Sequence, residues 1–91
     1  MEKARYIVEY DVAIEDKLRK LPKIVRDRIR EAIERRLMVA PLDYGKPLLR
    51  EWKGYRRLRV GDYRIIYRVF EERIVVFILQ VDHRKDVYED K

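Results

Sequence analysis

The residues best suited to chemistry form a basic cluster in the middle of the chain. Residues 50–68 hold only two acids, Glu51 and Asp62, against seven basic residues: Arg50, Lys53, Arg56, Arg57, Arg59, Arg64 and Arg68. Because Arg and Lys bind phosphate oxygens through charged hydrogen bonds, this excess indicates a phosphate-rich partner. The alternative interpretation is a solvated surface on which these side chains form ion pairs.

The residue types that the chain lacks exclude several kinds of catalytic and metal site. It has no Cys, Ser, Thr or Asn, which excludes Ser, Cys and Thr nucleophiles and also disulfides. A single histidine, His83, cannot build a multi-histidine zinc site, and thiolate ligands are missing. We therefore expect neither a metal nor another cofactor.

Length and composition predict one small domain over residues 1–91. Apolar residues make up 47% of the chain and charged residues 44%, with a formal net charge of +6. No apolar run reaches the ~18 residues of a membrane span, and no signal peptide is visible. We expect a cytoplasmic protein with no membrane partner. The heavy use of Arg, Lys and Glu also resembles proteins of thermophiles.

The first half of the sequence predicts a strand followed by a helical hairpin. Residues 5–10 alternate as a strand does, and Asp11 is a suitable N-cap for the first helix. The side chains that this helix turns toward the core are Val12, Ile14, Leu18 and Leu21. Pro22 suits the first turn of a second helix that stops before Pro41. Its apolar stripe is Val25, Ile29, Ala32, Ile33 and Leu37.

The second half predicts three antiparallel strands. These strands span residues 56–60, 63–70 and 73–81, after an irregular crossing over residues 39–54. Two-residue turns are expected at 61–62, where Gly-Asp suits a type II′ turn, and at 71–72. The predicted fold class is α+β, a small antiparallel sheet with an N-terminal helical hairpin packed on one face, in the order β-α-α-β-β-β.

Two-residue turns also fix which side chains share a face of the sheet. The face under the helices holds Leu58, Val60, Tyr63, Ile65, Tyr67, Val69, Ile74, Val76 and Ile78. The other face holds Arg57, Arg59, Arg64, Arg68 and Arg73 with Ile66, Phe70, Val75, Phe77 and Leu79.

On that second face Arg59 and Arg64 are expected directly opposite each other, about 5 Å apart at their Cβ atoms. Two cations at this distance repel by roughly 0.8 kcal/mol in water, and an anion between them reverses the sign. The pair therefore predicts a phosphate site, unless the side chains splay apart or Glu51 or Asp62 neutralises them.

The motifs of the chain resemble those of a toxin superfamily. They are GYRRLRVGDYRIIY at residues 54–67 and HRKDVY at 83–88, preceded by KLRKLPKIVRDRIREAIE at 17–34 and GKPLLREWKG at 45–54. Together they resemble the RelE/ParE superfamily of toxin–antitoxin toxins. The resemblance implies the fold predicted above. It also implies one of two activities, because RelE-type members cut mRNA in the ribosomal A site and ParE-type members poison DNA gyrase.

RelE-like cleavage would proceed without a metal. The RNA 2′-hydroxyl attacks the neighbouring phosphorus, which leaves a 2′,3′-cyclic phosphate and a 5′-hydroxyl. The resemblance implies catalytic positions at Arg57, Arg64, Arg84 and Tyr88, with His83 as a candidate for proton transfer. The predicted RNA- and phosphate-binding residues are Lys53, Arg56, Arg57, Arg59, Arg68 and Lys85.

Two mechanisms are open, and they differ in the group that accepts the proton of the 2′-hydroxyl. Some family members carry lysines where this chain has Arg56 and Arg57, and an arginine stays protonated, so it cannot be a general base. Either His83, with an ordinary pKa of about 6.5, transfers the proton, or the positive pocket lowers the barrier alone. A third interpretation of His83 is a strand-end residue that only bonds the backbone.

The sequence thus predicts a RelE-like, ribosome-dependent mRNA endoribonuclease. Its expected partners are the ribosome with mRNA and a cognate acidic antitoxin, with a toxin–antitoxin heterotetramer as one possible assembly. The alternatives are a ParE-like gyrase inhibitor and a basic RNA-binding domain without activity. The predicted antitoxin contacts are Ile66, Val75, Phe77 and Leu79, because a soluble monomer rarely leaves such a patch bare. The first strand and the crossing could instead close this patch internally.

Overall fold

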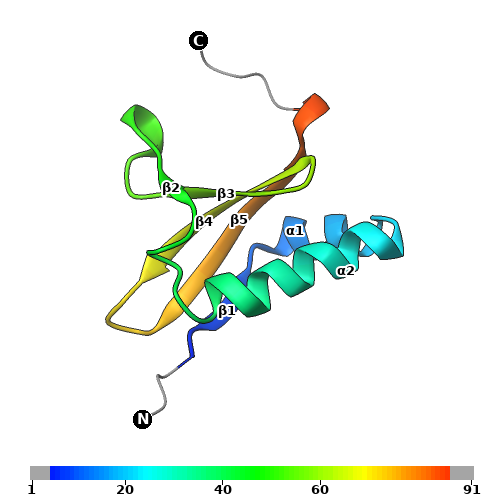
Figure 1. The fold of residues 1–91 in the computed structure, drawn as a ribbon. Coiled ribbons are helices and arrows are strands. Elements are labelled where there is room, and N and C mark those ends of the chain that lie inside the picture. Colours follow the sequence, from blue (N-terminus) through cyan, green and yellow to red (C-terminus); the bar gives the residue numbers. More distant parts are fainter. Residues whose placement is uncertain (1–4, 87–91) are drawn as a thin grey trace.

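The computed structural model, which describes residues 5–86, confirms the α+β class. In chain order the elements are β1 (Ile7–Tyr10), α1 (Val12–Arg19), α2 (Lys23–Ala32), the π-helical turn η1 (Ile33–Leu37), β2 (Lys46–Pro47), the 3₁₀ turn η2 (Arg50–Trp52), β3 (Arg56–Val60), β4 (Tyr63–Phe70), β5 (Val75–His83) and the 3₁₀ turn η3 (Arg84–Asp86). The strands form one sheet in the order β1-β5-β4-β3-β2, and both helices lie on the same side of it (Figure 1). Over residues 5–86 no helix combines the length and apolarity that a membrane crossing requires.

One strand departs from the predicted antiparallel pattern. β1 pairs in parallel with β5, with Ile7 opposite Val75 and Tyr10 opposite Ile78, so the sheet is mixed. A parallel pair requires a long crossover connection, which the helical hairpin and the rest of the chain supply. The chain therefore leaves β1 at one edge of the sheet and reaches β2 at the other edge (Figure 1).

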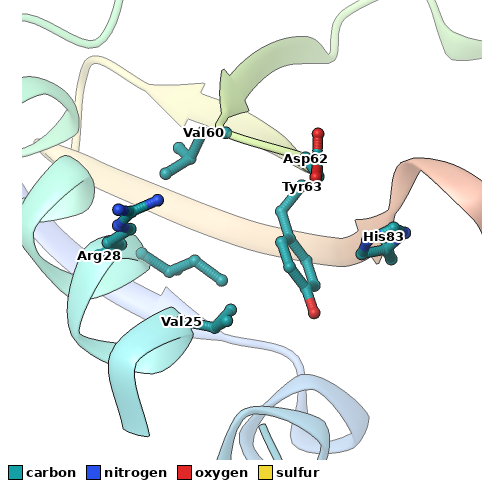
Figure 2. Close-up of a pocket in the computed structure, with 8 residues that line it drawn as sticks. Val25, Arg28, Val60, Asp62, Tyr63 and His83 are labelled. Atoms are coloured by element: carbon teal, nitrogen blue, oxygen red, sulfur yellow. The ribbon is translucent and has the colours of Figure 1, made fainter. Parts of the chain in front are cut away.

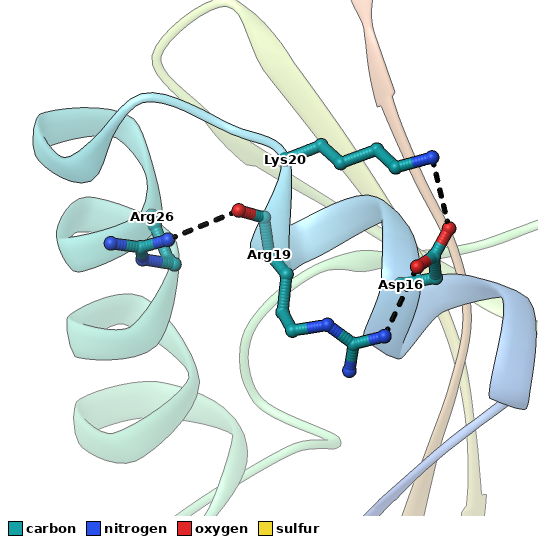
Figure 3. Close-up of polar contacts among 4 residues, drawn as sticks. All are labelled: Asp16, Arg19, Lys20 and Arg26. Carbon is teal, nitrogen blue, oxygen red and sulfur yellow. Dashed lines mark hydrogen bonds and ion pairs between the residues drawn. The ribbon is translucent and has the colours of Figure 1, made fainter.

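The helical hairpin begins and turns through local polar contacts. The backbone N–H of Ala13 donates to Asp11 Oδ1 at 3.0 Å, which confirms the predicted cap of α1. At the end of α1, Asp16 pairs with Lys20 at 3.2 Å and with Arg19 at 3.0 Å, and Arg26 of α2 donates to the Arg19 carbonyl (Figure 3). Hydrogen bonding and charge from Lys20, with a smaller effect of Arg19, lower the pKa of Asp16.

The core lies between the helices and the sheet. The predicted stripe of α2 and η1 is confirmed, because Ile29, Ala32, Ile33 and Leu37 are buried and Val25 packs against them. On α1, Ile14 is buried and Leu18 is half-buried. The prediction for Val12 is wrong, since this side chain is 81% exposed. It is the first residue of α1, directly after the cap, and it points away from the sheet that Ile14 contacts.

The β3–β4 hairpin has the predicted register. Val60 pairs with Tyr63, Arg59 with Arg64 and Leu58 with Ile65. Gly61 has φ 59°, whereas Asp62 is not among the residues with positive φ, which agrees with a type II′ turn. The two-residue turn therefore sets the faces of β3 and β4 as the sequence predicted.

The β4–β5 hairpin differs from the prediction in two ways. Residues 71–74 all lie in the turn, so Val69 pairs with Val76 rather than with Ile74. This shift of two residues keeps Val76 and Ile78 on their predicted face, but the prediction for Ile74 is wrong, because it lies in the turn and is 38% exposed. Beyond Ile78 the parity changes, because Leu79 is an extra residue between the pairs Tyr67–Ile78 and Ile66–Gln80. This bulge carries Val81 into the core, where it is fully buried.

Candidate nucleic-acid interface

The sheet has one face that the helices do not cover, called here the open face. Strand alternation and register place on it Lys46, Arg57, Arg59, Arg64, Ile66, Arg68, Phe70, Val75, Phe77, Gln80 and Asp82. Arg59 and Arg64 lie directly opposite each other, as predicted. Among residues 5–86 no ion pair involves Arg57, Arg59 or Arg64. The open face therefore presents uncompensated positive charge.

Arg64 is the most constrained of these cations. The side chain is half-buried, and its Nε atom is buried without a hydrogen-bond partner among the described residues. Asp82 lies directly across from Arg64 on β5, but Lys17 of α1 binds the Asp82 carboxylate at 2.6 Å. The acid opposite Arg64 is thus bound by another cation, and Arg64 is available to an external anion.

Long side chains of the open face cover part of its apolar surface. Ile66 is 2% exposed and Val75 is 5% exposed, so the prediction that both belong to a bare patch is wrong. Ile66 has Arg57 and Gln80 as its cross-strand neighbours, and Val75 has Ile7 and Phe70. At Ile66 the aliphatic stems of Arg57 and Gln80 can cover the smaller side chain while their polar ends reach water, whereas the neighbours of Val75 are themselves apolar. Phe77 and Leu79 remain half-buried.

Lys46 is a cation of the open face that the sequence analysis missed. It lies opposite Arg57 because β2 pairs with the first residues of β3. A two-residue strand gives no periodic signal, and the same segment was expected to be irregular. Lys46 extends the positive charge of the open face to the outer edge of the sheet.

A buried tyrosine holds the segment that carries Lys46. The Tyr67 hydroxyl lies 2.8 Å from the Pro41 carbonyl and 2.7 Å from the Tyr44 carbonyl, and its single proton is shared between them. Burial raises the pKa of Tyr67, and the nearby Arg56 opposes this effect. Gly45 follows with φ 72°, and a Cβ atom at this position would lie 2.5 Å from the Tyr67 hydroxyl.

Arg56 does not share the face of the other strand arginines. Its guanidinium donates to the carbonyls of Leu42 at 3.0 Å and Gly45 at 3.2 Å, so it supports the crossing segment. The prediction that Arg56 binds phosphate therefore lacks support from its position. Lys53 and Lys85 are exposed, in or beside the 3₁₀ turns η2 and η3.

Arg84 lies near the arginine pair, at the end of β5. Its backbone N–H donates to the Asp62 carbonyl at 2.7 Å, and its guanidinium is 3.8 Å from the Asp62 carboxylate. Asp62 belongs to the β3–β4 turn, two residues before Arg64. The structure thus brings Arg84 to the same end of the sheet as Arg59 and Arg64. Tyr88 lies outside the described residues.

His83 lies on the helical side of the sheet, away from the arginine pair. It is opposite Tyr63, and the two rings meet edge to face with centroids 5.0 Å apart. Both line a pocket of about 220 Å³ between α2 and the β3–β4 hairpin, together with Arg28 and Val25 (Figure 2). The bulge at Leu79 is the physical reason, because an unbroken alternation from Val75 would place His83 on the open face.

The imidazole of His83 is also engaged by the backbone. Its Nδ1 atom accepts a hydrogen bond from the Lys85 N–H at 3.0 Å. An accepting Nδ1 leaves the proton of a neutral imidazole on Nε2, so the ring has no free basic nitrogen in this arrangement. Of the interpretations of His83, the strand-end residue that bonds the backbone fits this geometry best.

Comparison with known proteins decides the family. Residues 8–88 match the model of the ParE toxin of the type II toxin–antitoxin system parDE. Toxin RelG of Mycobacterium tuberculosis is 40% identical over 83 residues, which cover 91% of this chain and 95% of the relative. The chain belongs to the RelE/ParE superfamily of toxins.

Solved structures of this superfamily share the fold. The toxin–antitoxin complex RelBE2 of Mycobacterium tuberculosis contains a chain with 37% identity and a TM-score of 0.83, over 91% of this chain and 95% of that one. The isolated Escherichia coli RelE toxin has 25% identity and a TM-score of 0.71, over 86% and 83% of the two chains. The archaeal RelE–RelB complex of Pyrococcus horikoshii has 26% identity and a TM-score of 0.70, over 90% and 98%. The chain is therefore a RelE/ParE-type toxin in fold and in sequence.

Proposed function

We propose that this toxin is a RelE-like endoribonuclease that cuts mRNA on the ribosome. The observation that supports the proposal most is the Arg59–Arg64 pair on the open face, where Arg64 keeps a buried Nε atom without a partner. Two opposed guanidiniums without acids of their own suit a phosphodiester. The similarity to toxin RelG and to RelE points the same way.

The proposed chemistry uses positive charge rather than a protein nucleophile. The RNA 2′-oxygen forms a bond to the neighbouring phosphorus while the bond to the 5′-oxygen breaks, giving a 2′,3′-cyclic phosphate and a 5′-hydroxyl. Arg64 and Arg59 stabilise the charge that develops on the phosphoryl oxygens, and Arg84 adds a third cation at the same end of the sheet. Arginine does not accept the proton, and His83 faces the helices. Solvent water therefore takes the proton of the 2′-hydroxyl and supplies the proton that the leaving 5′-oxygen gains.

We also propose an acidic antitoxin as the partner that silences the protein. Two of the similar toxins were solved as RelB–RelE-type complexes, from Mycobacterium tuberculosis and Pyrococcus horikoshii. The open face offers positive charge at Arg57, Arg59 and Arg64, and the half-buried Phe77 lies opposite Arg68 on the same face. An acidic segment bound there would neutralise the charges and exclude RNA at the same time.

A second candidate function is inhibition of DNA gyrase. It is favoured by the match of residues 8–88 to the ParE toxin model. A gyrase inhibitor is a binding protein and needs no group that assists phosphodiester cleavage. The arginine pair would then contact either the topoisomerase or its DNA.

Induction of the protein in cells separates the two functions. Sequencing of mRNA 5′ ends should reveal new 5′-hydroxyl ends inside translated regions, while plasmid supercoiling stays unchanged. A protein that relaxes plasmid supercoiling and creates no new mRNA ends would contradict the nuclease proposal and support the gyrase alternative. A toxin with Arg64→Ala is the internal control, because it should lose the new ends and keep the fold.

A further inference from the structure

Five side chains are linked by aromatic and cation–π contacts beside the open face. The Trp52 and Tyr55 rings meet edge to face, with centroids 5.7 Å apart. The guanidinium of Arg68 lies 5.6 Å from the Tyr55 ring centroid and 5.1 Å from that of Phe70. Arg73 follows, 5.4 Å from the same Phe70 ring. This aromatic–arginine row, Trp52, Tyr55, Arg68, Phe70 and Arg73, runs from η2 across β4 to the β4–β5 turn.

The row is not explained by stability alone. Arg68 and Arg73 are exposed, and cation–π contacts at exposed sites contribute little to folding. Glu71 and Glu72 share the turn with Arg73, yet no ion pair among residues 5–86 involves Arg68 or Arg73. The contacts instead place flat aromatic and guanidinium groups side by side at the surface.

The aromatic–arginine row continues the charged part of the open face. Every second residue of β4 points to this side of the sheet: Arg64, Ile66, Arg68 and Phe70. The buried Ile66 lies between Arg64 and Arg68. Four residues of strand separate Arg64 from Arg68 by ~13 Å. A ligand strand that crosses the Arg59–Arg64 pair and follows β4 therefore reaches the row.

The chemistry of the row selects one class of ligand. An acidic peptide would use its charges but has no need of aromatic planes, whereas a single-stranded nucleic acid uses both. Bases stack on aromatic rings and on guanidinium planes, while the phosphates contact the cations. We propose that the aromatic–arginine row binds about two or three unpaired bases of single-stranded RNA beside the phosphate held at Arg59 and Arg64. This proposal rests on the proposed function, in that it takes RNA as the ligand.

The test compares two oligomers that share a backbone. One is fluorescent 2′-O-methyl oligouridine of about ten nucleotides, which cannot be cut, and the other is its abasic counterpart. Fluorescence anisotropy measures the affinity of the wild-type protein for each. The variants are Phe70→Leu, which keeps apolar volume but removes the ring, and Arg68→Gln. Arg35→Gln on the helical side is the control, since it removes one charge far from the row.

The expected result is that the wild-type protein prefers the oligomer with bases. Phe70→Leu and Arg68→Gln should each weaken binding of the oligomer with bases roughly fivefold or more and remove the preference over the abasic oligomer. Arg35→Gln should change neither the affinity nor the preference. Arg64→Ala should weaken both oligomers equally and keep the preference. Circular dichroism checks that each variant folds. If Phe70→Leu does not fold, Arg68→Gln alone tests the row.

Three results would overturn the proposal. Equal binding of both oligomers by the wild-type protein would contradict base stacking on the row, while RNA would remain the partner. Binding of neither oligomer would contradict the RNA function as well. Binding of a poly-glutamate peptide that is lost in Phe70→Leu, with RNA binding unchanged, would assign the row to an acidic protein partner.

Discussion

Asp82 and Arg64 face each other on adjacent strands, and yet the carboxylate binds Lys17 on α1 at 2.6 Å. This choice of partner decides whether Arg64 can bind an external anion. The Asp82 side chain is 22% exposed and that of Lys17 is 41% exposed, so the pair is partly shielded from water. We therefore expect Lys17, although it lies on a helix, to act as a positioning residue for the open face.

Replacement of Lys17 tests this role. In Lys17→Met the Asp82 carboxylate is free to pair with Arg64. RNA binding should therefore weaken about three- to tenfold, which is the usual contribution of one partly exposed charge contact. The double variant Lys17→Met with Asp82→Asn should recover the affinity, because the competing acid is gone. Failure of the second substitution to restore binding would mean that Lys17 acts in another way.

His83 gives a second prediction at the scale of one residue. His83→Gln should change the cleavage rate by less than about tenfold, below the ~10²–10⁴ expected for loss of a general acid or base. The Gln carbonyl can still accept the hydrogen bond of the Lys85 N–H, so Arg84 should stay in place. A pH–rate profile that flattens between about pH 5.5 and 7.5 in this variant would instead show that His83 transfers a proton.

The crossing between η1 and β3 depends on the buried Tyr67 hydroxyl. Tyr67→Phe leaves the carbonyls of Pro41 and Tyr44 without their donor and should cost about 1–3 kcal/mol of unfolding free energy at neutral pH. Burial raises the pKa of Tyr67 in the folded state. The stabilisation is therefore present below the ordinary tyrosine pKa of about 10 and is lost as pH rises through the raised value. Urea titrations at neutral and alkaline pH should show the difference between wild type and variant shrinking above about pH 10; a difference independent of pH would contradict this account.

Gly45 sets the position of β2 and therefore of Lys46. A Cβ atom there would approach the Tyr67 hydroxyl at 2.5 Å and the Arg57 carbonyl at 2.7 Å. Gly61 also has positive φ, but a Cβ atom there would have no neighbour within 4 Å. We expect Gly61→Ala to cost about 1–2 kcal/mol from backbone strain alone, and Gly45→Ala to cost clearly more. Equal losses in thermal unfolding would mean that β2 can shift without penalty.

Much of the fold was predictable where local rules determine pairing. The Gly61-Asp62 turn fixed the register of β3 and β4, and with it the Arg59–Arg64 pair. The β4–β5 turn was not predictable, because Ile74 belongs to an apolar run and yet adopts φ 54°, which β-branched residues rarely do. The parallel pairing of β1 is a long-range contact without a periodic signal.

The candidate site was predictable to the same extent. Arg57, Arg59 and Arg64 follow from strand alternation next to a short turn. His83 does not, since the single extra residue at Leu79 exchanges the two faces for every residue after it. Ile66 was expected to be exposed because alternation gives the face of a side chain but not the cover that long neighbours supply.

At the scale of the whole molecule, the sheet separates two surfaces with different roles. The helices lie along one face of the sheet and close it into the core (Figure 1). The other face gathers the cations of β2, β3 and β4. The formal net charge of +6 adds a long-range attraction for RNA and for acidic proteins. Because the proposed RNA and antitoxin sites overlap on one face, binding of either should exclude the other.

The central claim, that the Arg59–Arg64 pair stabilises phosphodiester cleavage, is tested most directly with purified ribosomes programmed with a defined mRNA. Wild-type protein should release a fragment that ends in a 2′,3′-cyclic phosphate and one that begins with a 5′-hydroxyl. Arg64→Ala should fold normally and cut about 10²–10³ times more slowly, the usual cost of one preorganised charge contact, while Arg35→Gln cuts at the wild-type rate. A folded Arg64→Ala protein with an unchanged cleavage rate would contradict the account.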